Sequence, residues 1–138
     1  MDITAAVISK LKADTAVAAK VSTRVFRELI GNFPGLPCIV VSKVDDVRDI
    51  GSSTGRYSTA RVQCSSYAST DAAADELSEL VADALDRQRN TTFGTTAADY
   101  VQIVGVNDAG SVSDSNAKIL AQIYHRDFVI EYLIKFTR

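Results

Sequence analysis

The sequence is poor in the residues that build catalytic and metal-binding sites. It has one histidine, His125, and two cysteines, Cys38 and Cys64, among 138 residues. A closed zinc site needs four such ligands, so this set cannot supply one. Neither cysteine lies in a local sequence that resembles a nucleophile elbow or a cysteine-protease motif. We therefore expect no catalytic residues, no metal ligands and no cofactor.

Two further binding patterns are also missing. The glycines do not form the phosphate-binding arrangement that follows a strand and opens a helix. The acidic residues Asp45, Asp46 and Asp49 lack the ligand spacing and central glycine of a calcium-binding EF-hand loop. A solvated acidic loop is the simpler interpretation of these three residues.

An excess of one charge and a long apolar run are absent too. Lys and Arg total 15 against 17 Asp and Glu, a formal charge of -2. A dedicated nucleic-acid binder usually shows a basic excess or stripe, so the sequence does not predict one. No apolar run is long enough to span a membrane, and the N-terminus lacks a signal-peptide pattern. We expect a reducing, aqueous compartment in which both cysteines are free and buried.

What is present is the composition of an ordinary folded domain. Hydrophobic residues make up 46% of the chain and charged residues 23%, as in soluble globular proteins. A chain of this length can bury a substantial core without metal or disulfide crosslinks. We therefore expect a single domain over residues 1–138.

The spacing of apolar residues predicts the order of helices and strands. Apolar residues recur at helical intervals over residues 2–21, with a break near Asp14, and over residues 69–89. The second helix should bury Ala73, Leu77, Leu80, Val81, Ala84 and Leu85. Strands are expected at residues 24–30, 38–47, 57–67, 100–106 and 123–136, and polar loops at 90–98 and 107–116.

Alternation within the strands predicts which side chains are buried. On the strand at 57–67, Ala60, Val62 and Cys64 share one face. On the last strand, one face carries Tyr124, Phe128, Ile130, Tyr132, Ile134 and Phe136. The opposite face carries His125, Asp127, Glu131 and Lys135, and a solvent-exposed histidine is the simplest interpretation there.

This order predicts an α+β fold, with an antiparallel or mixed β-sheet, two main helices packed on one face and a long projecting β-hairpin. The strand at 123–136 would extend roughly 46 Å, whereas a compact chain of this length is about 37 Å across. The strand and the hairpin over residues 38–67 should therefore bend or project. Projecting strands have unpaired edges, and such edges favour pairing with a partner.

The tip of the hairpin is the candidate interface. Its loop mixes both charge signs beside a glycine-rich turn, an arrangement that can fix the register and orientation of a neighbouring subunit. The alternative is a mobile, solvated loop. The candidate interface residues are Asp45, Asp46, Arg48, Asp49, Arg56 and Tyr57.

Four stretches of the chain carry a family resemblance. They are Leu11–Val21 followed by Arg24-Val25-Phe26, the proline-flanked strand Leu36–Ser42, the strand Arg61–Tyr67 with the helix Thr70–Leu85, and the C-terminal Phe128–Tyr132. In these places the chain resembles the tail-completion, or tail-terminator, proteins of long-tailed, siphovirus-like bacteriophages and gene-transfer particles. Phe26 departs from the pattern, which often has tyrosine there.

The resemblance implies one tail-terminator-like domain and a structural role without catalysis or cofactor. Such a virion protein forms a hexameric ring at the head-proximal end of the tail. The ring ends polymerisation of the tail tube and provides the surface that joins the tail to the head connector. The implied partners are further copies, the tail tube protein and the connector or stopper protein, without a membrane. DNA would pass through the lumen without specific binding, and assembly would take place in the host cytoplasm.

Two alternatives are kept beside this interpretation. One is a neck or head-completion protein that binds a different ring. The other is a small thiol-dependent enzyme that pairs Cys38 or Cys64 with His125.

Overall fold

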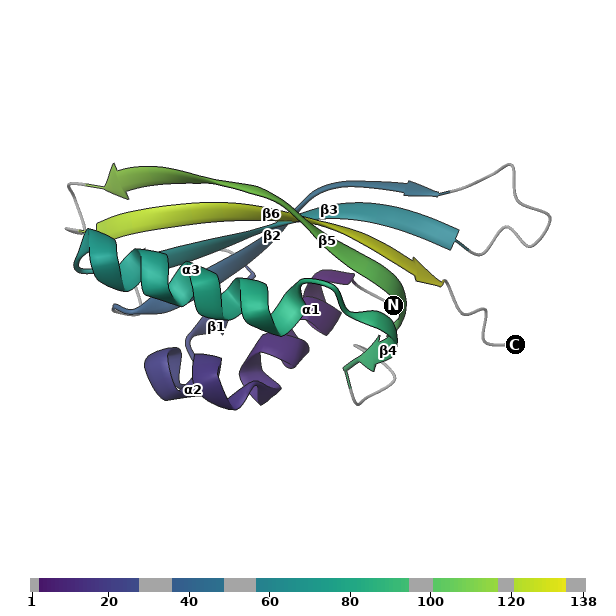
Figure 1. Ribbon diagram of the computed structural model, residues 1–138, viewed down its shortest axis with the longest axis horizontal. Coiled ribbons are helices and arrows are strands. Elements are labelled where there is room, and N and C mark those ends of the chain that lie inside the picture. The colour runs from purple at the N-terminus through teal and green to yellow at the C-terminus, as the bar shows by residue number, and fades with distance from the viewer. Residues whose placement is uncertain (1–2, 28–35, 49–56, 95–100, 117–120, 134–138) are drawn as a thin grey trace.

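The computed structural model describes residues 3–27, 36–48, 57–94, 101–116 and 121–133. These residues form three helices, all on one face of a six-stranded sheet (Figure 1). The helices are α1 (Ile3–Ala13), α2 (Thr15–Val21) and α3 (Asp71–Leu85). The strands are β1 (Val25–Phe26), β2 (Cys38–Arg48), β3 (Tyr57–Ala68), β4 (Arg89–Phe93), β5 (Val101–Asn116) and β6 (Ala121–Leu133).

Polar side chains cap the first turns of α2 and α3. The Asp14 carboxylate accepts hydrogen bonds from the backbone N–H groups of Ala16 and Val17, each at 3.1 Å. This cap begins α2 and confirms the predicted break between the first two helices. The hydroxyl of Thr70 caps α3 in the same way, accepting from Ala73 N at 3.1 Å.

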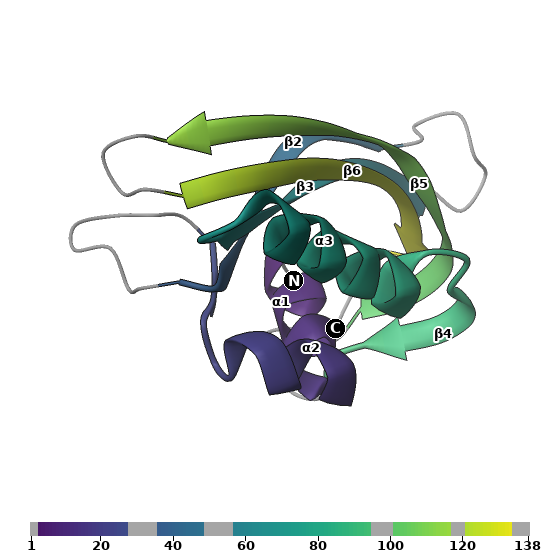
Figure 2. The same cartoon turned by 60° about the vertical axis from the view of Figure 1, so that its left-hand side comes forward.

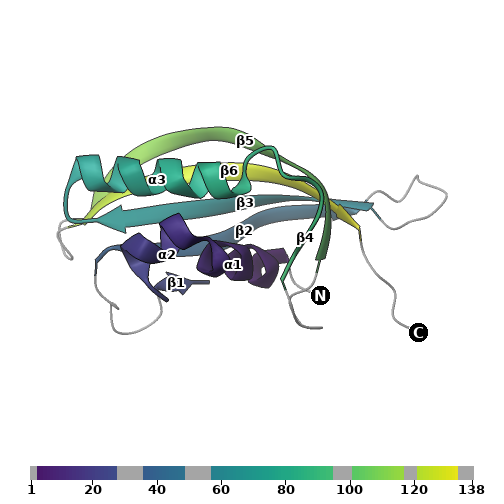
Figure 3. The same cartoon turned by 60° about the horizontal axis from the view of Figure 1, so that its bottom comes forward.

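The strand order across the sheet is β1-β2-β3-β6-β5-β4. β1 runs parallel to β2, and every other neighbouring pair is antiparallel. The predicted α+β class with a mixed sheet is therefore confirmed. The sheet curls around the helices, so that its concave face forms the core and its convex face lies on the other side (Figures 2 and 3).

The predicted hairpin is formed by β2 and β3. Their register runs from Cys38 opposite Tyr67 to Arg48 opposite Ser58, with a bulge between Lys43 and Asp45. The connecting residues 49–56 lie outside the described residues. Projection of the hairpin beyond the body therefore stays a prediction.

Both predicted polar loops were wrong for the part that the structure describes. Residues 107–116 continue β5, because β6 pairs with them as far as Asn116 opposite Ala121. Backbone pairing with a long neighbouring strand outweighs the weak strand propensity of this segment, which is rich in Ser, Asp and Asn. Residues 89–93 form β4, and Phe93 is buried in the core.

The core fills the space between the helices and the concave face. The strand face with Ala60, Val62 and Cys64 is buried as predicted. On α3 the predicted stripe is shifted at its start, because Ala74 is buried and Ala73 is exposed. The largest fully buried side chains are Phe93, Phe128, Leu11, Ile39, Leu77, Leu85, Ile103, Ile130, Val7, Val17, Val21 and Val41.

The buried face of β6 changes along the strand. Phe128, Ile130 and Tyr132 are buried on the concave face, as expected. Near the start of β6, Tyr124 is only partly buried, whereas Ile123 on the convex face is 4% exposed. A single-face pattern therefore describes the second half of this strand and not its first residues.

Candidate assembly surfaces

The structure describes the six predicted interface residues to different extents. Asp45 is exposed next to the bulge of β2, and Asp46 follows it in the same strand. Arg48 and Tyr57 end and begin the two hairpin strands, and only their backbone is described. Asp49 and Arg56 lie outside the described residues. Of the six predicted interface residues, the structure therefore describes the side chains of two, Asp45 and Asp46.

The Asp46 side chain is held in place by hydrogen bonds from two hydroxyl groups, although the residue itself lies at the surface. Tyr132 Oη donates a hydrogen bond to Asp46 Oδ2 at 2.6 Å, and the Ser58 hydroxyl donates a short one to Oδ1. Lys43 Nζ lies 3.8 Å from the same carboxylate. Since these groups come from β2, β3 and β6, the carboxylate ties three strands together. Asp46 is thus a structural anchor, whereas Asp45 presents its charge at the surface.

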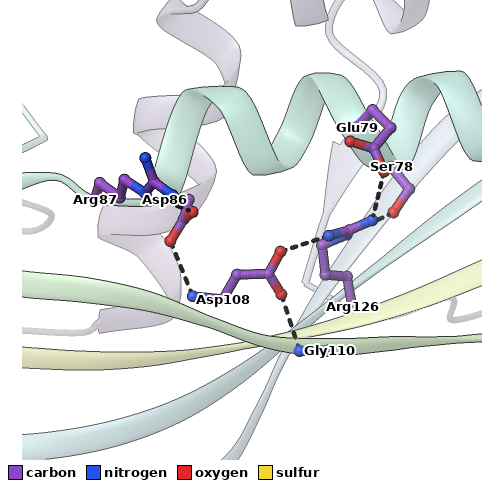
Figure 4. Close-up of polar contacts among 7 residues, drawn as sticks. All are labelled: Ser78, Glu79, Asp86, Arg87, Asp108, Gly110 and Arg126. Carbon is purple, nitrogen blue, oxygen red and sulfur yellow. Dashed lines mark hydrogen bonds and ion pairs between the residues drawn. The ribbon is translucent and has the colours of Figure 1, made fainter.

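A second polar cluster joins α3 to the sheet, as Figure 4 shows. Arg126 on β6 has a side chain only 12% exposed, and its guanidinium donates to Ser78 Oγ at 3.0 Å and to Glu79 Oε1 at 2.9 Å, both on α3. It also donates to Asp108 Oδ2 on β5 at 2.5 Å. One buried cation therefore links three elements.

Asp108 connects this cluster to the end of α3. Its backbone N–H donates to Asp86 Oδ1 at 3.0 Å, and its own carboxylate accepts from Gly110 N at 2.9 Å. The sequence pattern did not predict a role for Arg126. The available signal was a basic residue on the same strand face as Phe128 and Ile130, where an apolar side chain is expected.

The convex face carries a row of polar contacts between β3 and β6. Arg61 Nε and Gln63 Nε2 donate to the carboxylate of Asp127 at 2.9 and 3.2 Å. Ser65 Oγ lies 2.7 Å from His125 Nδ1. His125 is thus partly buried in a hydrogen-bonded row, and not the freely exposed histidine that the sequence suggested. Ser65 is 5% exposed, too buried for a substrate to reach its hydroxyl.

A comparison with protein families identifies the kind of protein. The model of the family described as "Tail completion protein gp17" matches residues 5–134, nearly the whole chain. The chain belongs to this tail completion family. It is therefore a structural protein of the phage tail or neck, located in the virion tail. The resemblance found in the sequence is confirmed.

A solved structure shows that the tail completion protein shares its fold with a virion component. The similar chain comes from "Virion of native gene transfer agent (GTA) particle". The TM-score is 0.70 at 18% sequence identity, and the match covers 95% of this chain and 94% of that chain. At this identity the likeness shows the fold alone. No curated protein matches the sequence.

The described part of this tail completion protein shows no cluster of three or more His, Cys, Asp or Glu side chains that could hold a metal ion. Among the helices of that part, none is long and apolar enough to cross a membrane.

Both cysteines of the tail completion protein are held as thiols by burial. Burial raises the pKa of Cys38 from its ordinary 9.0 to about 11, against a smaller opposing effect of the Arg24 charge. Burial, and secondarily the charge of Asp127, also raises the pKa of Cys64 far above its ordinary value. A nucleophilic cysteine needs the reverse, a lowered pKa and access to solvent.

We therefore expect slow alkylation of both cysteines in the folded protein. At pH 8, a thiol with a pKa near 11 forms about a hundredfold less thiolate than one near 9. Mass spectrometry after iodoacetamide treatment should show little label until denaturant is added. Rapid labelling of one cysteine in the folded protein would instead favour the thiol-enzyme alternative.

The same pKa shift gives a pH dependence. The unfolded chain loses the Cys38 proton near pH 9, whereas the folded chain keeps it to about pH 11. The stabilising effect of the protonated thiol is thus complete below pH 9 and falls as the pH rises through that interval.

Proposed function

We propose that this chain forms a hexameric ring at the head-proximal end of the tail tube. The ring ends tube polymerisation and provides the surface to which the head connector or stopper protein binds. Family membership over residues 5–134 is the observation that carries the proposal. The protein acts by geometry, as a structural component without catalytic activity.

Ring formation needs two different surfaces on each subunit. A head-to-tail contact brings one surface of a subunit against another surface of the next, and the repeated rotation closes the ring. A mixed sheet with two different edge strands, β1 and β4, and helices on one face offers such unlike surfaces. The net charge of -2 suits a lumen that lets DNA pass without holding its phosphates tightly.

The experiment measures association of the purified protein, alone and with isolated tail tubes. Light scattering gives the mass of the assembly, and electron microscopy of tails shows which end the protein decorates. We expect a closed oligomer at the head-proximal end. A monomer that never associates with tube ends would contradict the proposal. Decoration of the head connector alone would favour the neck or head-completion alternative.

The hairpin contributes a further expected result. Asp45→Lys should weaken ring assembly by roughly tenfold at low salt, because it reverses an exposed charge beside the expected interface. Asp46 is left intact, since its carboxylate holds the strands together. Sedimentation of assembled against free protein measures the effect.

The control makes an equal charge change elsewhere, with Glu131→Lys on the exposed surface of β6. Assembly of Asp45→Lys that equals wild type at low salt would remove the hairpin from the proposed interface.

A further inference from the structure

β5 is paired on both sides only over its first residues. β6 accompanies it from Gln102 to Asn116, whereas β4 pairs with it only from Val101 to Gly105. Directly after the last β5 residue that pairs with β4, Val106 forms two backbone hydrogen bonds, one with Arg87 and one with Gln88, both at 3.0 Å. Among the described residues, no strand pairs with the outer side of β5 beyond that point. We call residues 111–116 the open edge of β5.

The alternation of the ladder shows which groups this edge presents. Val106 directs its backbone N–H and C=O away from β6, because they bond to the residues before β4. In an antiparallel ladder this orientation recurs at every second pair. The bulge between Asp108 and Ser111 shifts the register of β5 against β6. Beyond it, the residues whose backbone groups point away from β6 are Ser111, Ser113 and Ser115.

This edge carries little of the usual protection against pairing. Residues 111–116 contain no lysine, arginine or proline and one charged residue, Asp114, and Ser111–Asp114 are all exposed. Natural edge strands commonly carry lysine, proline or a cover that prevents another chain from adding to them. An uncovered edge of this kind accepts an extended strand through backbone hydrogen bonds.

Within the part of the chain that the structure describes, β2 has a second open edge on the other side of the sheet. β1 pairs only with Ile39 and Val40, so residues 41–48 of β2 lie beyond it. Among the described residues, the exposed large hydrophobic side chains are Val44 at 55% and Val112 at 68%. One lies on each open edge, where burial against another chain would remove it from water.

The strand directions suit a pairing between these two edges. β2, β3, β6 and β5 are successively antiparallel, so β5 runs opposite to β2. A second copy that continues the sheet therefore places its β2 antiparallel to β5. Measured along β3, the open edge of β5 and the open part of β2 lie six residues apart. Asp114 is level with Tyr67 of β3 across β6, whereas Asp45 is paired with Arg61 of β3. Neighbouring copies are thus staggered by about 20 Å, which a closed ring accommodates by tilting its strands.

The charge of the helices bears on which edges can pair. α3, which packs on β3 and β6, contains acidic residues and no lysine or arginine. α1 and α2 contain Lys10, Lys12 and Lys20 and no acidic residue, but Lys10 lies over Phe93 of β4 and Lys20 pairs with Glu76 of α3 in the same copy. A twofold pairing of β5 with β5 would bring two acidic helices together, which is unfavourable.

We propose that the open edge of β5 pairs in an antiparallel manner with residues 41–48 of β2 in the next copy. This pairing rests on the proposed ring and identifies the strands that join its subunits.

Crosslinking tests the pairing in the assembled protein. Subunits with Val44→Cys are mixed with subunits with Ser113→Cys, assembled on tube ends and treated with a short bismaleimide. The native thiols do not interfere, because Cys38 and Cys64 are buried. We expect a crosslinked dimer from the mixture, none from Ser113→Cys alone and none when Thr59→Cys, on central strand β3, replaces Val44→Cys. A dimer from Ser113→Cys alone would show the twofold arrangement and overturn the proposal.

A proline variant tests the same edge without chemical crosslinking. Ser113→Pro removes a backbone N–H that points away from β6, whereas Ser113→Ala keeps it. We expect Ser113→Pro to lower assembly at least about tenfold with an unchanged circular dichroism spectrum, and Ser113→Ala to assemble normally. If Ser113→Pro folds and assembles like wild type, the pairing is wrong.

Failure of the pairing can be told from failure of the ring. A wild-type protein that assembles on tubes but gives no Val44–Ser113 crosslink overturns the pairing and leaves the ring. A wild-type protein that stays monomeric with tube ends present overturns both.

Discussion

Replacing Arg126 with alanine should lower the free energy of unfolding by about 3 kcal/mol. The guanidinium is 12% exposed and donates to Ser78, Glu79 and Asp108. Its loss leaves the Asp108 carboxylate, itself 23% exposed, without its cationic partner. Removing one member of a buried ion pair is costly because the remaining charge stays desolvated. Urea unfolding followed by circular dichroism measures the change.

Arg87→Ala is the matched control for this experiment. Arg87 is also close to a carboxylate, with Nε 3.7 Å from Asp86 Oδ2, but its side chain is 88% exposed. Exposed ion pairs contribute little, so the control should change stability by less than about 0.5 kcal/mol. Equal effects of the two substitutions would show that the Arg126 cluster does not hold α3 on the sheet.

Asp46→Ala should destabilise the fold by about 2 kcal/mol. It removes the carboxylate that accepts hydrogen bonds from Tyr132, which is 6% exposed, and Ser58, which is 1% exposed. Asp45→Ala, one residue away and exposed, should change stability by less than about 0.5 kcal/mol. Thermal and urea unfolding of both variants give the comparison.

A double-mutant cycle makes the Asp46 prediction sharper. If Asp46 stabilises the protein through Tyr132, then Tyr132→Phe should have a smaller effect in the Asp46→Ala background than in wild type. Strict additivity would place the effect of Asp46 elsewhere. The result also decides how charge reversal in the hairpin is interpreted, because reversing Asp46 together with Asp45 would mix lost assembly with lost stability.

The helices and the central strands could be predicted because their patterns are strong. α3 has capping residues before it and a clear apolar stripe, and β3 alternates from Ala60 to Cys64. Residues 107–116 could not be predicted as a strand, since Asn, Asp, Gly and Ser favour turns. They are extended because β6 lies beside them, and pairing between distant segments is not encoded in local propensity.

The candidate site was predictable only in part. The sequence correctly predicted that β2 and β3 pair as a hairpin, but the adjacent residues Asp45 and Asp46 cannot be told apart in a sequence. The two residues differ only in the folded protein, where Asp45 lies next to the β2 bulge and Asp46 accepts a hydrogen bond from Tyr132 on β6. The family was recognisable because residue-type patterns are spread over nearly the whole chain.

Tail length in particles assembled without this chain tests the central claim most directly. If the protein closes the tube as a ring, micrographs should show tails of uncontrolled length that are not joined to heads, and addition of the purified protein should restore joining. Tails of normal, uniform length, attached to heads in the absence of the protein, would contradict the account.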